Sequence, residues 1–136
     1  MGVYFNPRNE SFTQAKNSRI YIDKTGLIQE LNMRLSTEDK CIAVSHARRF
    51  GKSHAAGMID AYYSLGCDST KLFENTEIAK CADFKKYMNQ YNVIHLDISS
   101  FWDSYKENIV EKITEYVYKD FRKEFGEELD YGERFS

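Results

Sequence analysis

The spacing of apolar residues in the last third of the chain predicts a long helix. Apolar side chains recur every four residues, at Tyr105, Ile109, Ile113, Val117, Phe121 and Phe125. This interval keeps them on one face of an α-helix. Ser104 and Glu107 have the spacing of a capping box at the start of the repeat. The pattern predicts one amphipathic helix over residues 104–125.

Helical spacing occurs in two earlier stretches. Thr25 can cap a helix over residues 26–34, in which Leu27, Ile28, Leu31 and Leu35 share a face. A second helix is expected over residues 53–65, ending near Gly66, because glycine is a common residue just beyond a helix. A shorter helix is expected over residues 82–89.

Two other stretches are predicted to be strands. Residues 40–45 contain CIAV and residues 92–99 read NVIHLDIS, and runs without alternation are typical of strands buried on both faces of a parallel sheet. A weaker strand is expected at residues 19–23. Strands that alternate with helices predict an α/β fold, here small and incomplete, with parallel strands flanked by helices. The polar residues 1–18 are expected to form an extended arm.

Composition limits the class of protein. The 136 residues are 42% hydrophobic and 15% aromatic, which favours one folded domain over disorder. The formal charge of −2 gives no global attraction for nucleic acid. Three cysteines without a CxxC pair favour a reducing, cytoplasmic setting over a disulfide framework or zinc site. No apolar stretch is long enough to span a membrane, and the polar start has no signal-peptide core.

Residues 51–53 raise the question of phosphate binding. Gly51, Lys52 and Ser53 stand between a predicted strand and a predicted helix. In a phosphate loop, backbone N–H groups and the lysine bind phosphate oxygens, and the serine hydroxyl binds Mg²⁺. His46 occupies the position where such a loop normally has its first glycine. The alternative is a basic turn in which Arg48 and the next arginine are simply solvated.

The candidate loop is part of a wider resemblance. Residues 21–28 read YIDKTGLI and residues 45–53 read SHARRFGKS. They resemble the AAA-ATPase-like family of bacterial proteins, whose usual sequences are YVDKTGLI and SRPRRFGKS. The resemblance extends through AYYS at 61–64, GCDS at 66–69 and YNVI at 91–94, so it covers nearly the whole chain. It implies a P-loop NTPase-like domain.

The resemblance also implies ligands. ATP and Mg²⁺ are the expected cofactors, and the residues expected to bind them are Arg48, Arg49, Gly51, Lys52 and Ser53. The missing first glycine is a family trait, whereas His46 and Ala47 replace the family's arginine and proline. Loss of a fixed cation and of a ring-locked torsion is expected to loosen the loop and weaken phosphate binding.

Family members continue beyond the region of resemblance into an Asp-Glu-Tyr-Asp segment and a restriction-like nuclease domain. Neither is found in this sequence, so the chain is interpreted as a single truncated domain over residues 1–136, with little or no hydrolysis on its own. Asp97 is the acidic residue that fold-level reasoning places near Ser53, where it would help bind the metal. A helix or turn cap is the favoured role for Asp97.

Two functions remain open. The first is a nucleotide-binding module. The second is an interaction module without nucleotide chemistry, for example a mobile-element-borne inhibitor of a nucleic-acid-processing enzyme. An uncovered sheet edge and aromatic helix face would favour a homo-oligomer or a protein partner. A truncated gene product is a third possibility. His46, His54 and His95 lack metal-ligand spacing, and Cys41 is interpreted as a small core residue.

Overall fold

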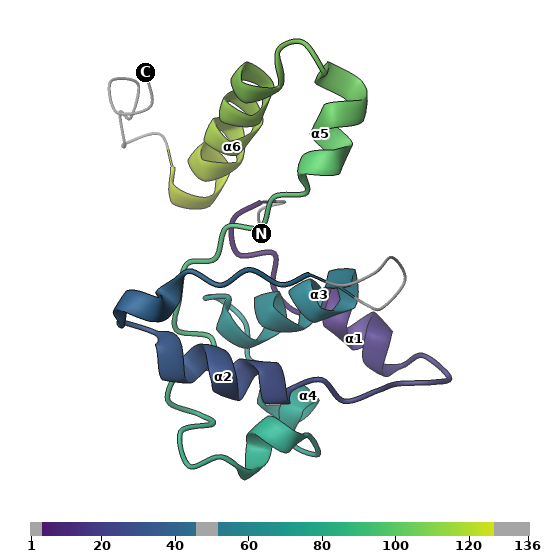
Figure 1. Cartoon of the computed structure of the whole chain (residues 1–136), viewed down its shortest axis with the longest axis vertical. Helices are drawn as coiled ribbons and strands as arrows, with labels where there is room; N and C mark the ends of the chain where they lie inside the picture. The colour runs from purple at the N-terminus through teal and green to yellow at the C-terminus, as the bar shows by residue number, and fades with distance from the viewer. Residues whose placement is uncertain (1–3, 46–51, 127–136) are drawn as a thin grey trace. The chain divides into compact units, whose positions relative to one another are not determined.

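The computed structural model describes residues 4–45 and 52–126, and this part of the chain is helical (Figure 1). The α-helices are α1 (Glu10–Lys16), α2 (Gly26–Arg34), α3 (Lys52–Tyr63), α4 (Thr70–Phe73), α5 (Ile98–Tyr105) and α6 (Ile109–Phe125). Two 3₁₀ helices, η1 (Glu38–Lys40) and η2 (Glu77–Lys80), lie between them. β-pairing in the described residues is limited to two isolated bridges.

The predicted α/β fold is therefore wrong for this structure. Residues 41–45 run without regular structure and are exposed, with 38% of Ile42 and 55% of Val44 accessible to solvent. Residues 92–97 form one antiparallel bridge, from Ile94 to Phe5, and α5 begins at Ile98. An apolar run specifies that a segment prefers burial, but a strand also needs a neighbour to pair with its backbone. Within the described residues, neither segment pairs with a neighbouring strand over more than one bridge. Residues 19–23, where a weaker strand was expected, are also not a strand.

The helices are closer to expectation. The helix predicted over 26–34 is α2, and α3 differs from its prediction by one or two residues at each end. The predicted helix over 104–125 is instead two helices, because residues 106–108 separate α5 from α6 and Ser104 lies inside α5. Residues 82–89 form turns, and α1 occupies part of the predicted arm.

The chain divides into two compact units. The first, which we call the N-terminal unit, is residues 8–91, and the second, the hairpin unit, combines the first seven residues with residues 92 onward. In the N-terminal unit α1 packs against α3. Gly57 permits this approach, since a Cβ there would lie 2.7 Å from Ser11 Oγ.

Aromatic side chains fill the centre of the N-terminal unit. Phe12 from α1 stacks on Phe73 from α4 with 4.8 Å between ring centroids, and Tyr62 from α3 meets the same ring edge-on at 5.5 Å. The other buried apolar residues of this core include Ile28, Met58, Ala61, Ile78, Phe84 and Met88. The core thus joins α1, α2, α3 and α4.

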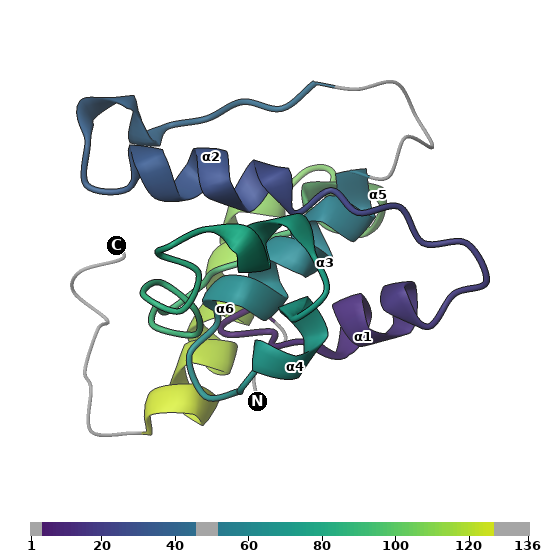
Figure 2. The same ribbon diagram turned by 90° about the horizontal axis from the view of Figure 1, so that it is seen from below.

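A buried polar network joins α2 to α3, which lie side by side in both views (Figure 1, Figure 2). The Asn32 amide donates to Tyr62 Oη at 3.1 Å and accepts from Tyr63 Oη at 2.5 Å. Tyr62 Oη in turn donates to the carbonyl of Phe84 at 2.8 Å. Burial raises the pKa of the Tyr63 hydroxyl far above its usual value. Both tyrosines therefore act as neutral hydrogen-bonding core residues.

Asn89 closes the C-terminal end of α3. Its backbone has φ of 56°, a left-handed conformation that asparagine tolerates. Its side-chain amide donates to the carbonyls of Ala61 at 3.0 Å and Ser64 at 2.9 Å, and accepts from the N–H of Ser69 at 3.0 Å. One side chain thus satisfies carbonyls at the helix end that lack intrahelical partners.

The hairpin unit consists of α5, α6 and the N-terminal segment. Phe101 of α5 lies edge-on to Tyr116 of α6 at 5.7 Å. The buried carboxylate of Asp120 accepts hydrogen bonds from the N–H groups of Tyr4 and Phe5, both at 2.8 Å. This side chain fastens the first described residues to α6.

Candidate functional site

Two of the predicted phosphate-binding residues begin α3. Lys52 and Ser53 are the first two residues of this helix, and their side chains are exposed. The first N–H groups of a helix have no intrahelical acceptor and lie at the positive end of its dipole. The predicted residues Arg48, Arg49 and Gly51 lie outside the described residues, as do His46 and Ala47.

Asp97, the other predicted metal ligand, belongs to the hairpin unit, whereas Ser53 belongs to the N-terminal unit. Asp97 is the N-cap of α5, and its Oδ1 accepts hydrogen bonds from the N–H of Ser99 at 3.1 Å and its hydroxyl at 2.5 Å. The hydroxyl hydrogen bond is the main cause of the lowered pKa of Asp97. The favoured role as a helix cap is confirmed. Within residues 4–45 and 52–126, no three His, Cys, Asp or Glu side chains form a group that could hold a metal ion.

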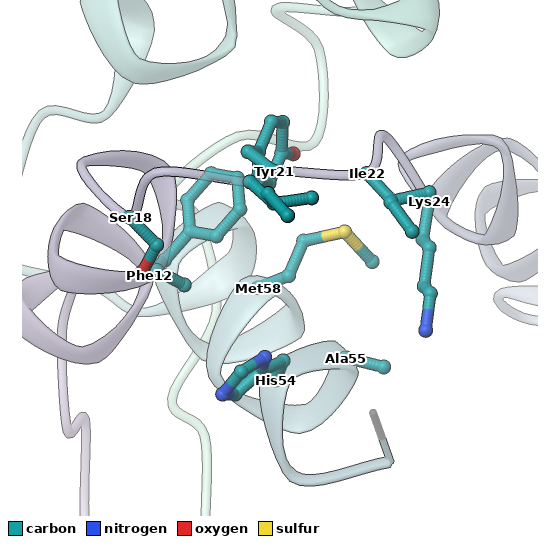
Figure 3. Close-up of a pocket in the computed structure, with 10 residues that line it drawn as sticks. Phe12, Ser18, Tyr21, Ile22, Lys24, His54, Ala55 and Met58 are labelled. Atoms are coloured by element: carbon teal, nitrogen blue, oxygen red, sulfur yellow. The ribbon is translucent and has the colours of Figure 1, made fainter. Parts of the chain in front are cut away.

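A cavity of about 410 Å³ lies beside the first two turns of α3. Its lining comes from α1, from the segment that joins α1 to α2, and from α3, and consists of Phe12, Ala15, Ser18, Ile20, Tyr21, Ile22, Lys24, His54, Ala55 and Met58 (Figure 3). Most of these side chains are apolar. The sequence analysis did not find this cavity, because its walls come from three segments that only the tertiary fold brings together.

Four of the lining side chains can form hydrogen bonds, and they are Ser18, Tyr21, Lys24 and His54. The Tyr21 hydroxyl is buried and has no hydrogen-bond partner among the described residues. Burial, with a smaller contribution from Asp23, raises the pKa of Tyr21, which keeps the hydroxyl protonated. Lys24 extends toward the start of α3, and His54 belongs to the first turn of that helix (Figure 3).

The segment that carries Lys24 is held by a hydrogen-bond network. Asp23 Oδ1 accepts from the N–H and hydroxyl of Thr25 at 2.8 and 2.7 Å, and Oδ2 accepts from the N–H of Glu77 at 2.9 Å. Thr25 Oγ1 accepts from the N–H of Ile78 at 3.1 Å. Burial alone would raise the pKa of Asp23, but these hydrogen bonds and the charge of Lys16 outweigh it, so the pKa is lowered.

This network shows that the predicted capping role of Thr25 is wrong, and it gives Asp23 and Thr25 a structural role that was not predicted from the sequence. Thr25 precedes α2 as expected, but its side chain does not cap the helix. Instead, Asp23 and Thr25 tie the start of α2 to η2. The Asp-x-Thr spacing, which favours a local side-chain turn, was the available signal.

Comparison with known proteins addresses the family directly. Residues 10–134 match the sequence profile of the family described as "Predicted AAA-ATPase". The chain belongs to this family. The matched range includes both the Asp23–Thr25 segment and the start of α3. No match to the chain was found among curated proteins or among solved structures.

None of the helices in the described ranges has both the length and the apolar character needed to cross a bilayer.

Proposed function

We propose that this AAA-ATPase family member binds a nucleoside triphosphate together with Mg²⁺, with little or no hydrolysis by this chain alone. The observation that supports the proposal most is the place of Lys52 and Ser53. They stand at the exposed start of a helix of 12 residues, in the sequence context Gly-Lys-Ser. Family membership adds the expectation of nucleotide chemistry.

The chemistry of this helix start suits a phosphate group. The free N–H groups and the helix dipole favour an anion. The Lys52 ammonium would neutralise phosphate oxygens, and the Ser53 hydroxyl would be the protein's ligand to Mg²⁺, which keeps several waters and binds phosphate as well. Arg48, Arg49 and Gly51 would complete the site, as the family resemblance implies.

Hydrolysis needs a group that orients or deprotonates the attacking water. The cavity beside α3 has no acidic residue among its described lining residues. Asp97 is engaged as the cap of α5. The proposed function is therefore limited to binding.

Calorimetric titration with ATP and Mg²⁺ tests the proposal. Lys52→Ala should weaken binding about ten- to a hundredfold, because a charge-assisted hydrogen bond is worth about 1.5–3 kcal/mol. Lys71→Ala removes the same charge from an exposed position on α4 and is the matched control, with no expected effect. His46→Arg with Ala47→Pro should strengthen binding. A wild-type melting temperature that does not change in millimolar ATP would refute the proposal.

A second candidate function is an interaction module that binds a second copy or a nucleic-acid-associated protein. It is favoured by large apolar side chains that stand exposed in the hairpin unit, with 56% of Ile94, 49% of Ile98 and 50% of Trp102 accessible. Light scattering at about 100 μM tests self-association, since weak dimers form in this range. Trp102→Gln should reduce any dimer, and a monomeric wild-type mass would contradict self-association.

A further inference from the structure

We infer that two copies of this chain associate through residues 92–97, by pairing the free backbone edge of this segment antiparallel with the same segment of the second copy. The inference is independent of nucleotide binding. It deepens the second candidate function, on which it rests, because it names both the partner and the surface that binds it.

One edge of residues 92–97 is already paired within the hairpin unit. The N–H of Asn6 donates to the carbonyl of Val93, and the N–H of His95 donates to the carbonyl of Tyr4, both at 2.8 Å. The N–H of Val93 donates to Asn6 Oδ1, also at 2.8 Å. These hydrogen bonds hold the segment extended beside the first described residues.

The opposite edge of the same segment is free. Ile94 and Phe5 form an antiparallel bridge between the two backbone hydrogen bonds, so they are a non-hydrogen-bonded pair, and the N–H and C=O of Ile94 point away from Phe5. Leu96, two positions later, has the same orientation in an extended chain. Among residues 4–45 and 52–126, the N–H and C=O of Ile94 and the N–H of Leu96 have no hydrogen-bond partner.

This free edge is accessible and lacks common protective features of an edge strand. The Ile94 side chain is 56% exposed, and Ile98 and Trp102, on the helix that follows, are also exposed. Edge strands are often protected by lysine or proline, and residues 92–97 contain neither. The edge therefore has both the backbone groups and the apolar side chains that another extended strand would cover.

A second copy fits this edge in one antiparallel register. In this register Ile94 lies opposite Leu96 of the second copy, and the two residues exchange both of their backbone hydrogen bonds. A two-fold axis repeats the pair, so the free groups of both copies gain partners. The side chains of Ile94 and Leu96 then contact each other on one face of the new sheet.

The same register is complementary in charge on the other face, where residues 93, 95 and 97 project. The two His95 imidazoles lie at the axis, and each is diagonal to Asp97 of the second copy, within reach of a carboxylate–imidazole contact. The two carboxylates are kept apart, because each Asp97 lies opposite Val93. The edge thus matches itself in hydrogen bonds, apolar contact and charge.

The neighbouring registers fit less well. A shift by two residues in one direction places Asn92 opposite Leu96, which loses the apolar pair. A shift in the other direction places Ile94 opposite Ile98, which begins α5 and has a carbonyl that belongs to the helix. Because the paired segment is short, we expect a weak dimer with a dissociation constant of roughly 10–100 μM.

Amide hydrogen exchange of the full chain, measured by NMR at about 20 μM and about 800 μM, tests the inference. The amides of Ile94 and Leu96 should exchange about three- to fivefold more slowly at the higher concentration, as the fraction of dimer expected from these dissociation constants requires. The amides of Val93 and His95 are hydrogen-bonded within one chain and serve as internal controls, with the same exchange at both concentrations.

A matched pair of variants locates the contact. Ile94→Lys places a charge at the paired edge and should weaken the dimer at least about tenfold in light scattering. Ile20→Lys makes the same substitution at an 80% exposed position of the N-terminal unit and should leave the dimer unchanged. Melting curves check that both variants are folded. The exchange measurement needs no variant, so it decides the question even if Ile94→Lys unfolds.

The outcomes separate the inference from the functions proposed above. A dimer whose Ile94 and Leu96 amides exchange equally at both concentrations would overturn the inference and leave self-association intact, as would a dimer that Ile20→Lys weakens as much as Ile94→Lys. A wild-type chain that is monomeric at about 800 μM would overturn both the inference and self-association. None of these results would change the test of nucleotide binding.

Discussion

The N-terminal unit and the hairpin unit bury different kinds of residue. The described part of the N-terminal unit buries ten apolar residues, from Phe12 to Met88, and this core is connected by side-chain hydrogen bonds of Asn32 and Asn89. The described part of the hairpin unit buries Phe5, Asn6, Phe101 and Asp120 and leaves several large apolar side chains exposed. The N-terminal unit also leaves large apolar side chains exposed, among them Ile20, Ile22 and Met33. The two units therefore differ in the size of the core that they bury, and both have exposed apolar surface.

This difference separates two kinds of function. A unit with a closed core can hold a cavity of fixed shape, as the N-terminal unit does beside α3. A unit with exposed Ile98 and Trp102 has apolar surface that a partner could cover. The nucleotide proposal therefore concerns the first unit, and the interaction proposal concerns the second.

The largest expected effect comes from the core of the N-terminal unit. Phe73→Ala should lower the free energy of unfolding by about 3–5 kcal/mol, because Phe73 is fully buried between two rings and its removal leaves a cavity. Phe125→Ala, in the hairpin unit, is the control and should cost much less because 37% of that side chain is exposed. Urea unfolding followed by circular dichroism measures both.

The fluorescence of Trp102 reports on the unfolding of the hairpin unit in the same experiment. Trp102 is the only tryptophan of the chain and belongs to the hairpin unit. If the units unfold separately, Phe73→Ala shifts the circular dichroism transition and leaves the Trp102 fluorescence transition in place. Equal shifts of both transitions would mean that the units unfold as one, and the distinction drawn between them would then not apply to stability.

The next effect concerns the polar part of the same core. Asn32→Leu should cost about 2–3 kcal/mol, because Tyr63 Oη loses its acceptor while it stays buried, whereas Tyr62 Oη keeps the Phe84 carbonyl. Urea unfolding measures the loss. Adding Tyr63→Phe to this variant removes the orphaned hydroxyl and should recover about 1 kcal/mol. A double variant no more stable than Asn32→Leu would show that the hydroxyl is satisfied in another way.

In the hairpin unit, Asp120→Ala is expected to cost about 1–2 kcal/mol. The substitution leaves the N–H groups of Tyr4 and Phe5 without their acceptor. The loss should be visible as a lower urea midpoint of Trp102 fluorescence. Glu111→Ala removes the same charge from an exposed position on α6 and should change the midpoint less. Equal effects of the two variants would indicate a general charge effect.

The smallest effect is a dependence on pH. The pKa of Asp23 is lowered in the folded chain, so the carboxylate adds stability above its unfolded pKa of about 3.9. This stability declines as the pH falls below about 3.9 and is lost below the folded pKa. Asp23→Asn should therefore be destabilised at pH 7 by less than about 1 kcal/mol, because Asp23 is largely exposed.

Melting temperatures measured between pH 7 and pH 3 check this prediction. The difference between the wild type and Asp23→Asn should shrink toward the acid end, while Asp39→Asn, an exposed control, should differ little from the wild type. A constant difference across the range would show that the effect of Asp23 does not depend on its charge.

Sequence reasoning predicted the helices better than the strands, for a physical reason. A helix satisfies its own backbone, so the spacing of Leu27, Ile28 and Leu31 was enough to predict α2. A strand depends on a neighbour, and the apolar run at 41–45 could not reveal whether one is present. Local pattern thus predicts elements whose hydrogen bonds are local.

The candidate site also has a part that the local sequence predicted and a part that it did not predict. Lys52 and Ser53 were predicted as site residues because they are adjacent in the sequence Gly-Lys-Ser, and they are the first residues of α3. The cavity was not predicted, because Phe12, Tyr21 and Met58 are brought together by packing across more than 40 residues. The role of Asp97 as a cap was predictable, since it depends only on Ser99 two positions later.

The clamp made by Asn89 has a consequence for folding order. Its hydrogen bonds to residues 61, 64 and 69 close the intervening chain into a loop. Asn89 can bind the carbonyls of residues 61 and 64 and the N–H of Ser69 only when the end of α3 has its native form, so we expect closure of the loop to follow formation of the helix. The same closure means that a single protease cut between residues 74 and 77 would leave both fragments attached through the clamp and the aromatic core. The nicked chain would separate only in denaturant.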